Sequence, residues 1–115
     1  MAHKMNLNPE PFAMIRSGQK TIELRLNDEK RQKINVGDSI EFTQIETGEK
    51  LTAEVIAIHR FESFAELYQK LPLLKCGYTK VDSVTAKPED MNLYYTPEQQ
   101  EKYGVLGIEI KAIRI

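Results

Sequence analysis

Three charged side chains whose types suit ligand binding or catalysis stand close together in the chain: Lys20, Glu23 and Arg25. On a strand, Glu23 and Arg25 share one face and lie about 7 Å apart. Lysine offers a point charge and arginine a planar fork of donors, so both can hold an anion or a base edge. The carboxylate can orient either cation, accept from an exocyclic amine or act as a base. If this face is buried, the pKa values of the three side chains can shift to values that suit binding or proton transfer.

A plainer interpretation of the same residues is one solvated face of an ordinary strand. The stretch Thr21–Leu26 alternates polar and apolar residues without a break, which predicts a strand with two chemically different faces. The polar face of such a strand usually carries solvated cross-strand pairs, so the pattern alone favours this interpretation. Strict alternation also puts Lys20 on the face of Ile22, so Lys20 must leave the strand geometry to join Glu23.

Local signals predict the elements that position these residues. Residues 3–7 alternate weakly and predict a short first strand. Asn8 followed by Pro9 is typical of a helix start, and Gly18 is well placed to end that helix. We therefore expect a helix over 9–17, directly before the strand that carries the charged residues.

Similar signals predict the rest of the architecture. Strands are expected over 39–45, 50–59 and 105–115, helices over 64–71 and 97–103, a helical turn over 88–95 and irregular chain over 72–86. This order predicts an α+β fold, with residues 1–115 forming a single domain. Five or six strands in so short a chain are expected to curl into a small barrel, which covers their edges. The pattern leaves open whether residues 72–95 form a lid.

Composition excludes several classes of protein. The 115 residues carry 16 Lys or Arg and 17 Asp or Glu, for a net charge of −1, so the chain is not coated in basic residues. It has no apolar run long enough to span a membrane and no signal-peptide core at its start. The single Cys76 excludes a disulfide framework, and His3 and His59 are far apart. We expect a cytoplasmic protein with no metal, no cofactor and no membrane partner; the oligomeric state is open.

One segment, residues 16–33, is locally basic. Its six cations and three acids give a local charge of +3, in contrast to the whole chain. Such a patch can follow a phosphate backbone and make binding sensitive to salt. The alternative is a mixed-sign loop that only keeps the protein soluble.

Residues in the second half of the chain offer further candidates. Tyrosines near a basic cleft can stack on bases, but more often they cover the core with a wet hydroxyl. We expect the core for Tyr95 and Tyr103 and keep Tyr94 as a candidate ligand contact. Arg60, at the end of a long strand, can reach a cleft rim. Cys76 is expected to be packed or idle, and His59 to be structural.

An ordered set of short motifs resembles the ASCH family (activating signal cointegrator homology domains). The set begins with Gly18-x-Lys20-x-x-Glu23-x-Arg25 and continues with Val36-Gly37-Asp38. Later parts are His59-Arg60-Phe61, Ser63-Phe64-x-x-Leu67 and the last strand from Gly104 to Ile110. The resemblance covers roughly residues 3–112, nearly the whole chain.

This resemblance implies a PUA-like β-barrel with helices closing one side. It also implies a cleft that binds RNA, a nucleotide or a modified nucleoside. Carried over residue by residue, the resemblance puts Lys20, Glu23 and Arg25 in that cleft, with Gly18 allowing close approach of the backbone.

Two enzymatic alternatives stay open beside the binding function. One branch of the family resembles an amidohydrolase that deacetylates acetylated cytidine with a Lys, a Thr three residues later and a later Glu. Here the first is Lys20, the Thr position holds Glu23, and the later acid is Glu89 or Asp90. A ribonuclease is the second alternative, because Lys, Arg and a carboxylate can assist phosphodiester cleavage.

Overall fold

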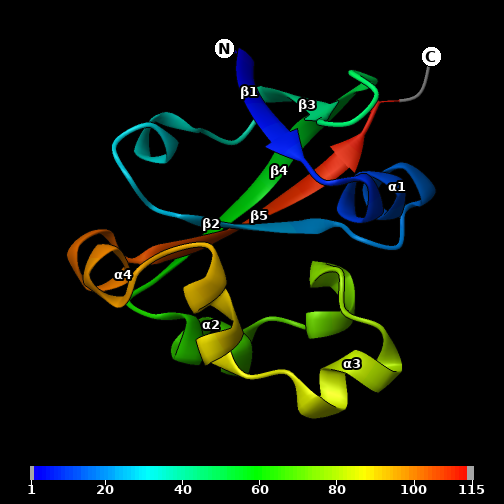
Figure 1. Ribbon diagram of the computed structural model, residues 1–115. Coiled ribbons are helices and arrows are strands. Elements are labelled where there is room, and N and C mark those ends of the chain that lie inside the picture. The colour runs from blue at the N-terminus through cyan, green and yellow to red at the C-terminus, as the bar shows by residue number, and fades with distance from the viewer. Residues whose placement is uncertain (1, 114–115) are drawn as a thin grey trace.

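A curled five-stranded sheet dominates the computed structural model, which describes residues 2–113 (Figure 1). The strands are β1 (Ala2–Leu7), β2 (Ile22–Leu26), β3 (Ser39–Gln44), β4 (Lys50–Phe61) and β5 (Val105–Ala112). Their spatial order is β1-β3-β4-β5-β2. β1 runs parallel to β3, and every other neighbouring pair is antiparallel. β3 and β4 are antiparallel neighbours that pair across the short turn between them.

Helices connect the strands and gather mainly on one side of the sheet (Figure 1). The α-helices are α1 (Pro9–Ser17), α2 (Phe64–Lys70), α3 (Lys80–Thr85) and α4 (Pro97–Tyr103), and the 3-10 helices are η1 (Arg31–Lys33), η2 (Leu73–Cys76) and η3 (Pro88–Leu93). The bounds of α1 are the predicted ones, and Gly18 ends it in the left-handed conformation at φ 86°. α4 has the predicted bounds and begins with a capping box between Thr96 and Gln99.

The predicted α+β fold class is confirmed, and the curled sheet is a half-barrel. Within residues 2–113 it has five strands, and its end strands β1 and β2 are not paired with each other. One side chain crosses this open seam: Arg25 on β2 donates from Nη2 to the carbonyl oxygen of Asn6 on β1, at 3.0 Å. The seam is therefore the place where a ligand can reach the edge of β2.

Two apolar clusters fix the position of β2 relative to the rest. One fills the curled sheet beneath α1, where Phe12 and Ile15 are each 2% exposed. The other joins β2 to the helices of the second half and includes Ile22, Leu24 and Phe64. Each fully buried side chain of this size contributes about 1.5–3 kcal/mol. An exposed ion pair contributes at most about 1 kcal/mol. Apolar packing therefore holds the strand that carries the charged residues.

Two predicted elements need correction. Residues 72–86 are not irregular, because η2 and α3 lie there. The apolar residues of α3, Val81 and Val84, are 80% and 84% exposed, so this helix has no buried apolar face of the kind on which a helical pattern in the sequence depends. The last strand ends at Ala112, and residues 114–115 of the predicted strand lie outside the described residues.

A contact between β1 and the turn before β3 makes stability depend on pH. His3 Nε2 lies 2.9 Å from Asp38 Oδ2, which also accepts the backbone N–H of Asn35 at 2.9 Å. The hydrogen bond with His3 has the largest effect on this carboxyl group, followed by that from Asn35. They lower the pKa of Asp38 from 3.8 to about 2. The carboxylate therefore stabilises the fold fully above about pH 4 and loses this contribution as the pH falls toward 2.

We predict that Asp38→Asn lowers the melting temperature at neutral pH and that the difference from the wild type shrinks between pH 4 and 2. Thermal unfolding followed by circular dichroism across this range measures the effect. Glu62→Gln, at an exposed carboxylate after β4, is the control and should leave the profile unchanged. A difference that stays constant down to pH 2 would contradict the assignment of the effect to this carboxylate.

Candidate functional site

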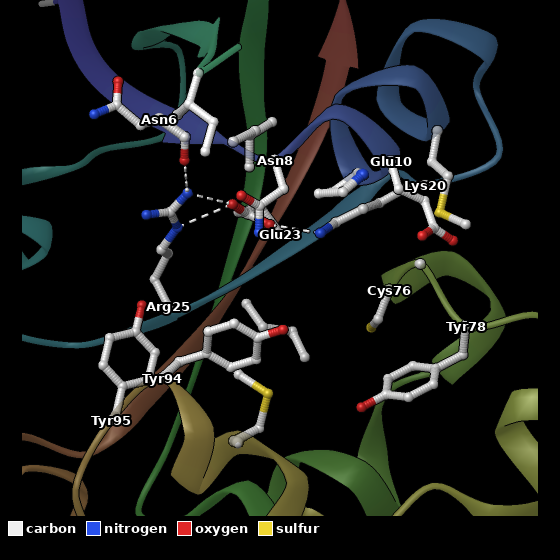
Figure 2. A pocket seen from close by; sticks show the side chains of 17 residues that line it. Asn6, Asn8, Glu10, Lys20, Glu23, Arg25, Cys76, Tyr78, Tyr94 and Tyr95 are labelled. Atoms are coloured by element: carbon white, nitrogen blue, oxygen red, sulfur yellow. Dashed lines mark hydrogen bonds and ion pairs between the residues drawn. The ribbon is translucent and has the colours of Figure 1, made fainter.

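A cavity of about 510 Å³ opens at the seam of the half-barrel (Figure 2). Its walls come from four places: the end of β1 with α1, the edge of β2 with Lys20 before it, the turn after β3 at Ile45, and the segments 76–78 and 91–95. The polar residues that line it are Asn6, Asn8, Glu10, Lys20, Glu23, Arg25, Cys76, Tyr78, Tyr94 and Tyr95. Cavities of this size are typical of small-molecule sites.

A buried charged cluster forms one wall of this cavity. Lys20 Nζ lies 2.7 Å from Glu23 Oε1, and Arg25 donates to Glu23 Oε2 from Nε at 2.9 Å and from Nη2 at 2.7 Å. Glu23 is 3% exposed and Lys20 8%. The solvated-face interpretation of this strand is therefore wrong, because Glu23 is buried and paired with two cations.

Lys20 reaches Glu23 because it lies outside the strand. Its backbone N–H donates to the carbonyl of Met14 at 3.0 Å, and the next N–H, of Thr21, donates to the carbonyl of Lys75 at 2.8 Å. Regular pairing of β2 begins only at Ile22. Gly77 makes room for the lysine: a Cβ there would lie 3.1 Å from Lys20 Cδ, and the backbone has φ +100°.

Electrostatics keep the cluster ionised. Burial alone raises the pKa of Glu23, but the charges of Lys20 and Arg25 and their hydrogen bonds outweigh it, so the pKa lies below the ordinary 4.5. Burial lowers the pKa of Arg25, whereas Glu23 and the Tyr95 hydroxyl raise it, with a net increase. Glu23 is thus a weak base, and the three groups carry a net charge of +1.

Cys76 faces the same cavity with a neutral thiol. Burial raises the pKa of this thiol to about 11; the charge of Lys20 opposes this increase and that of Glu23 adds to it. The prediction of a packed thiol agrees with its burial, but its place beside Lys20 and Glu23 was not foreseen (Figure 2).

The structure brings four of the predicted site residues together and leaves three elsewhere. Lys20, Glu23, Arg25 and Tyr94 all line the cavity. The other three lie outside its lining: Gly18 ends α1 with open space around its Cα, and Arg60 and Glu89 are exposed on β4 and η3. Asp90, the other candidate acid, accepts the backbone N–H of Lys87 and is exposed as well.

Several cavity residues had no recognisable signal in the sequence. Asn8 occupies the predicted N-cap position, but its side chain makes no capping hydrogen bond and lines the cavity instead. Tyr78 comes from the segment predicted to be irregular, and its hydroxyl is hydrogen-bonded to that of Tyr68. Asn6 and Glu10 line the cavity because the end of β1 and the start of α1 lie across the seam from β2.

Two further expectations concern charge and the remaining tyrosines. Of the six cations in residues 16–33, four are in ion pairs, with Glu49, Glu23 or Asp28. Only Glu49 comes from outside the segment, so the local charge falls from +3 to +2 and the patch stays basic. Tyr95 packs against the second apolar cluster as expected and also lines the cavity. His59 lies 3.4 Å from Glu109 on the neighbouring strand, an acid that is distant in sequence.

The described residues offer neither a cluster of metal ligands nor a helix suited to a membrane. Residues 2–113 contain no group of three or more His, Cys, Asp or Glu side chains arranged to hold a metal ion. In the same range no helix combines the length and apolar character needed to cross a membrane.

Comparison with known proteins identifies the family. A family model for the ASCH domain matches residues 5–114. The chain belongs to the ASCH domain family. This family generally binds RNA. The match confirms the resemblance to this family that the ordered motifs of the sequence indicate.

Solved structures agree with this assignment to the ASCH family. The hypothetical protein PH0355 is 35% identical with a TM-score of 0.82, over 98% of this chain and 100% of that chain. Protein PF0455 from Pyrococcus furiosus is 36% identical with a TM-score of 0.77, over the full length of both chains. The ASCH protein from Zymomonas mobilis is 16% identical with a TM-score of 0.60, over 98% of this chain and 71% of that chain, and shows the fold alone. No curated protein matches the chain.

Proposed function

We propose that this ASCH domain binds RNA, through one nucleotide unit, or a free nucleotide or modified nucleoside, in the cavity at the seam. The observation that carries the proposal is the buried cluster of Lys20, Glu23 and Arg25 on the wall of an open cavity of about 510 Å³. Burying three charged groups is costly unless they are paired, and this cluster keeps an excess cation beside a space large enough for a ligand.

Aromatic side chains supply the second feature that a nucleobase requires. Tyr94 is 66% exposed at the cavity, with its hydroxyl directed toward the middle (Figure 2). Exposed tyrosines are stacking platforms for unpaired bases. Tyr95 also lines the cavity, and its ring is stacked against that of Phe64, with the ring centroids 6.3 Å apart.

The state of the titratable groups favours binding over catalysis. A carboxylate with a lowered pKa is a poor general base, and this one is already engaged by Lys20 Nζ at 2.7 Å. Glu89, the third member of the amidohydrolase set, is exposed outside the cavity. The enzymatic alternatives are tested directly by incubating the protein with acetylated cytidine or with RNA and following the products by chromatography.

Titration of short single-stranded RNA and of nucleotides at low salt tests the binding function. Arg25→Ala is expected to weaken binding, because it removes a cation and the link to Asn6 across the seam. Arg60→Ala, at an exposed arginine outside the cavity, is the matched control and should bind as the wild type does. If neither RNA nor any nucleotide binds the wild type, the proposal fails.

The single cysteine offers an independent test of where the ligand lies. We predict that a saturating ligand slows the reaction of Cys76 with a small thiol reagent severalfold, since this buried residue lines the cavity. Without ligand the rate should rise as the pH rises toward 11, because the thiolate is the reactive form. A labelling rate that is the same with and without bound ligand would place the ligand elsewhere.

We also propose a cytoplasmic location for this protein, where reducing conditions would keep the Cys76 thiol free.

A further inference from the structure

Lys20 has hydrogen-bonding capacity that the protein does not use. Its ammonium group carries three donors, and one of them reaches Glu23 Oε1 at 2.7 Å. Within residues 2–113 no other acceptor is hydrogen-bonded to Nζ, although the side chain is 9% exposed and lines the cavity. The two remaining donors border the open cavity, where no group of residues 2–113 accepts them. They are therefore available for acceptor atoms of a ligand.

Glu23, in contrast, has almost no capacity left. Its Oε1 accepts from Lys20, and its Oε2 accepts twice from Arg25. A carboxylate has about four lone-pair positions, so three are occupied, and the side chain is 4% exposed. The carboxylate thus serves to hold the two cations and is not free to receive the amine of a base.

We propose that Lys20 Nζ recognises two adjacent acceptor atoms of the ligand, so that the cavity selects guanine or cytosine over adenine and uracil. This inference rests on the proposed nucleotide-binding function and adds its base selectivity. Guanine presents O6 beside N7, and cytosine presents O2 beside N3. In adenine and uracil, donors and acceptors alternate, so only one acceptor can face the two free donors. Lysine paired with O6 and N7 of guanine is a common contact in nucleic-acid recognition.

The ligand series GMP, CMP, AMP and UMP tests this selectivity on the unmodified protein, because the phosphate and ribose are constant. We expect GMP or CMP to bind about 5- to 150-fold more tightly than AMP and UMP, the range for a good two-bond contact. The 7-deaza analogue of GMP and the 3-deaza analogue of CMP each lack one acceptor. The deaza analogue of the preferred nucleotide should lose most of the affinity that this nucleotide gains over AMP and UMP. The result therefore shows whether guanine or cytosine is the base that Lys20 recognises.

A protein variant provides the second test. Lys20→Met removes both free donors, so the preference among the four nucleotides should disappear, with the preferred nucleotide losing more affinity than AMP and UMP. Lys75→Met, at an exposed lysine outside the cavity, is the control and should keep the preference. Circular dichroism establishes whether each variant is folded. If Lys20→Met does not fold, the deaza analogues test the base selectivity on the unmodified protein.

The possible results separate the two proposals. Equal affinity for all four nucleotides, or full affinity for both deaza analogues, overturns the base selectivity and leaves the binding function standing. Inorganic phosphate that competes as well as the nucleotides shows an anion site and also overturns the selectivity. If none of the four nucleotides and no RNA binds, the proposed function itself fails.

Discussion

Replacing Glu23 with glutamine is expected to lower the free energy of unfolding by about 3–5 kcal/mol, the cost of leaving buried charge without its partner. Glu23 compensates two cations at once, through contacts of 2.7 Å to Lys20 and to Arg25. A glutamine keeps the shape and part of the hydrogen bonding but removes the negative charge. The two cations would then face each other in an environment that is only 3% exposed at this residue.

Chemical denaturation measured against Glu41→Gln tests this expectation. The control removes the same charge from an exposed pair, in which Lys50 Nζ lies 3.3 Å from Glu41 Oε1, and should change stability by less than about 1 kcal/mol. Because the pKa of Glu23 is lowered from 4.5, its contribution is present above that pH and is lost as the pH falls through the folded value. Similar losses in the two variants at pH 7 would mean that the cluster exchanges with water and is not a buried charge site.

The sequence predicts the placement of Glu23 and Arg25 well because that placement depends on local periodicity. An alternation of period two puts both on one face of any strand, and the helix stop at Gly18 places the start of that strand within a few residues. The family resemblance adds the curled sheet, since the ordered motifs span nearly the whole chain. Both predictions hold without knowledge of what covers the strand.

The other half of the site depends on contacts between distant segments, which periodicity does not encode. Lys20 turns toward Glu23 because Thr21 is hydrogen-bonded to Lys75 and because Gly77 has no side chain in the way. Cys76 and Tyr78 belong to a stretch whose apolar residues are largely exposed, so no buried face marked it as structured. Glu89 was a candidate catalytic residue only through the family resemblance. The residues around it in the sequence do not indicate whether it faces the cavity, and in the structure it lies outside the lining.

Replacing Tyr94 with alanine is expected to weaken binding of single-stranded RNA about 5- to 150-fold, because one base stacked on an aromatic ring is worth about 1–3 kcal/mol. The ring is 66% exposed and lines the cavity that holds Lys20 and Glu23. Since so little of it is packed, stability should stay within about 0.5 kcal/mol of the wild type. Affinity and stability are thus expected to change independently at this position, in contrast to Glu23.

Leu93→Ala is the matched control for Tyr94→Ala. Leu93 is the preceding residue, is 85% exposed and lies outside the cavity, so its removal takes away apolar surface of the same segment but no stacking platform. Fluorescence anisotropy with labelled RNA at two salt concentrations measures both variants. A stacking loss should be nearly the same at each salt, whereas a loss of phosphate contacts would shrink as the salt concentration rises. Equal affinities of Tyr94→Ala and the wild type would show that the base does not stack on this ring. Recognition would then rest on the buried charges of the cavity wall alone.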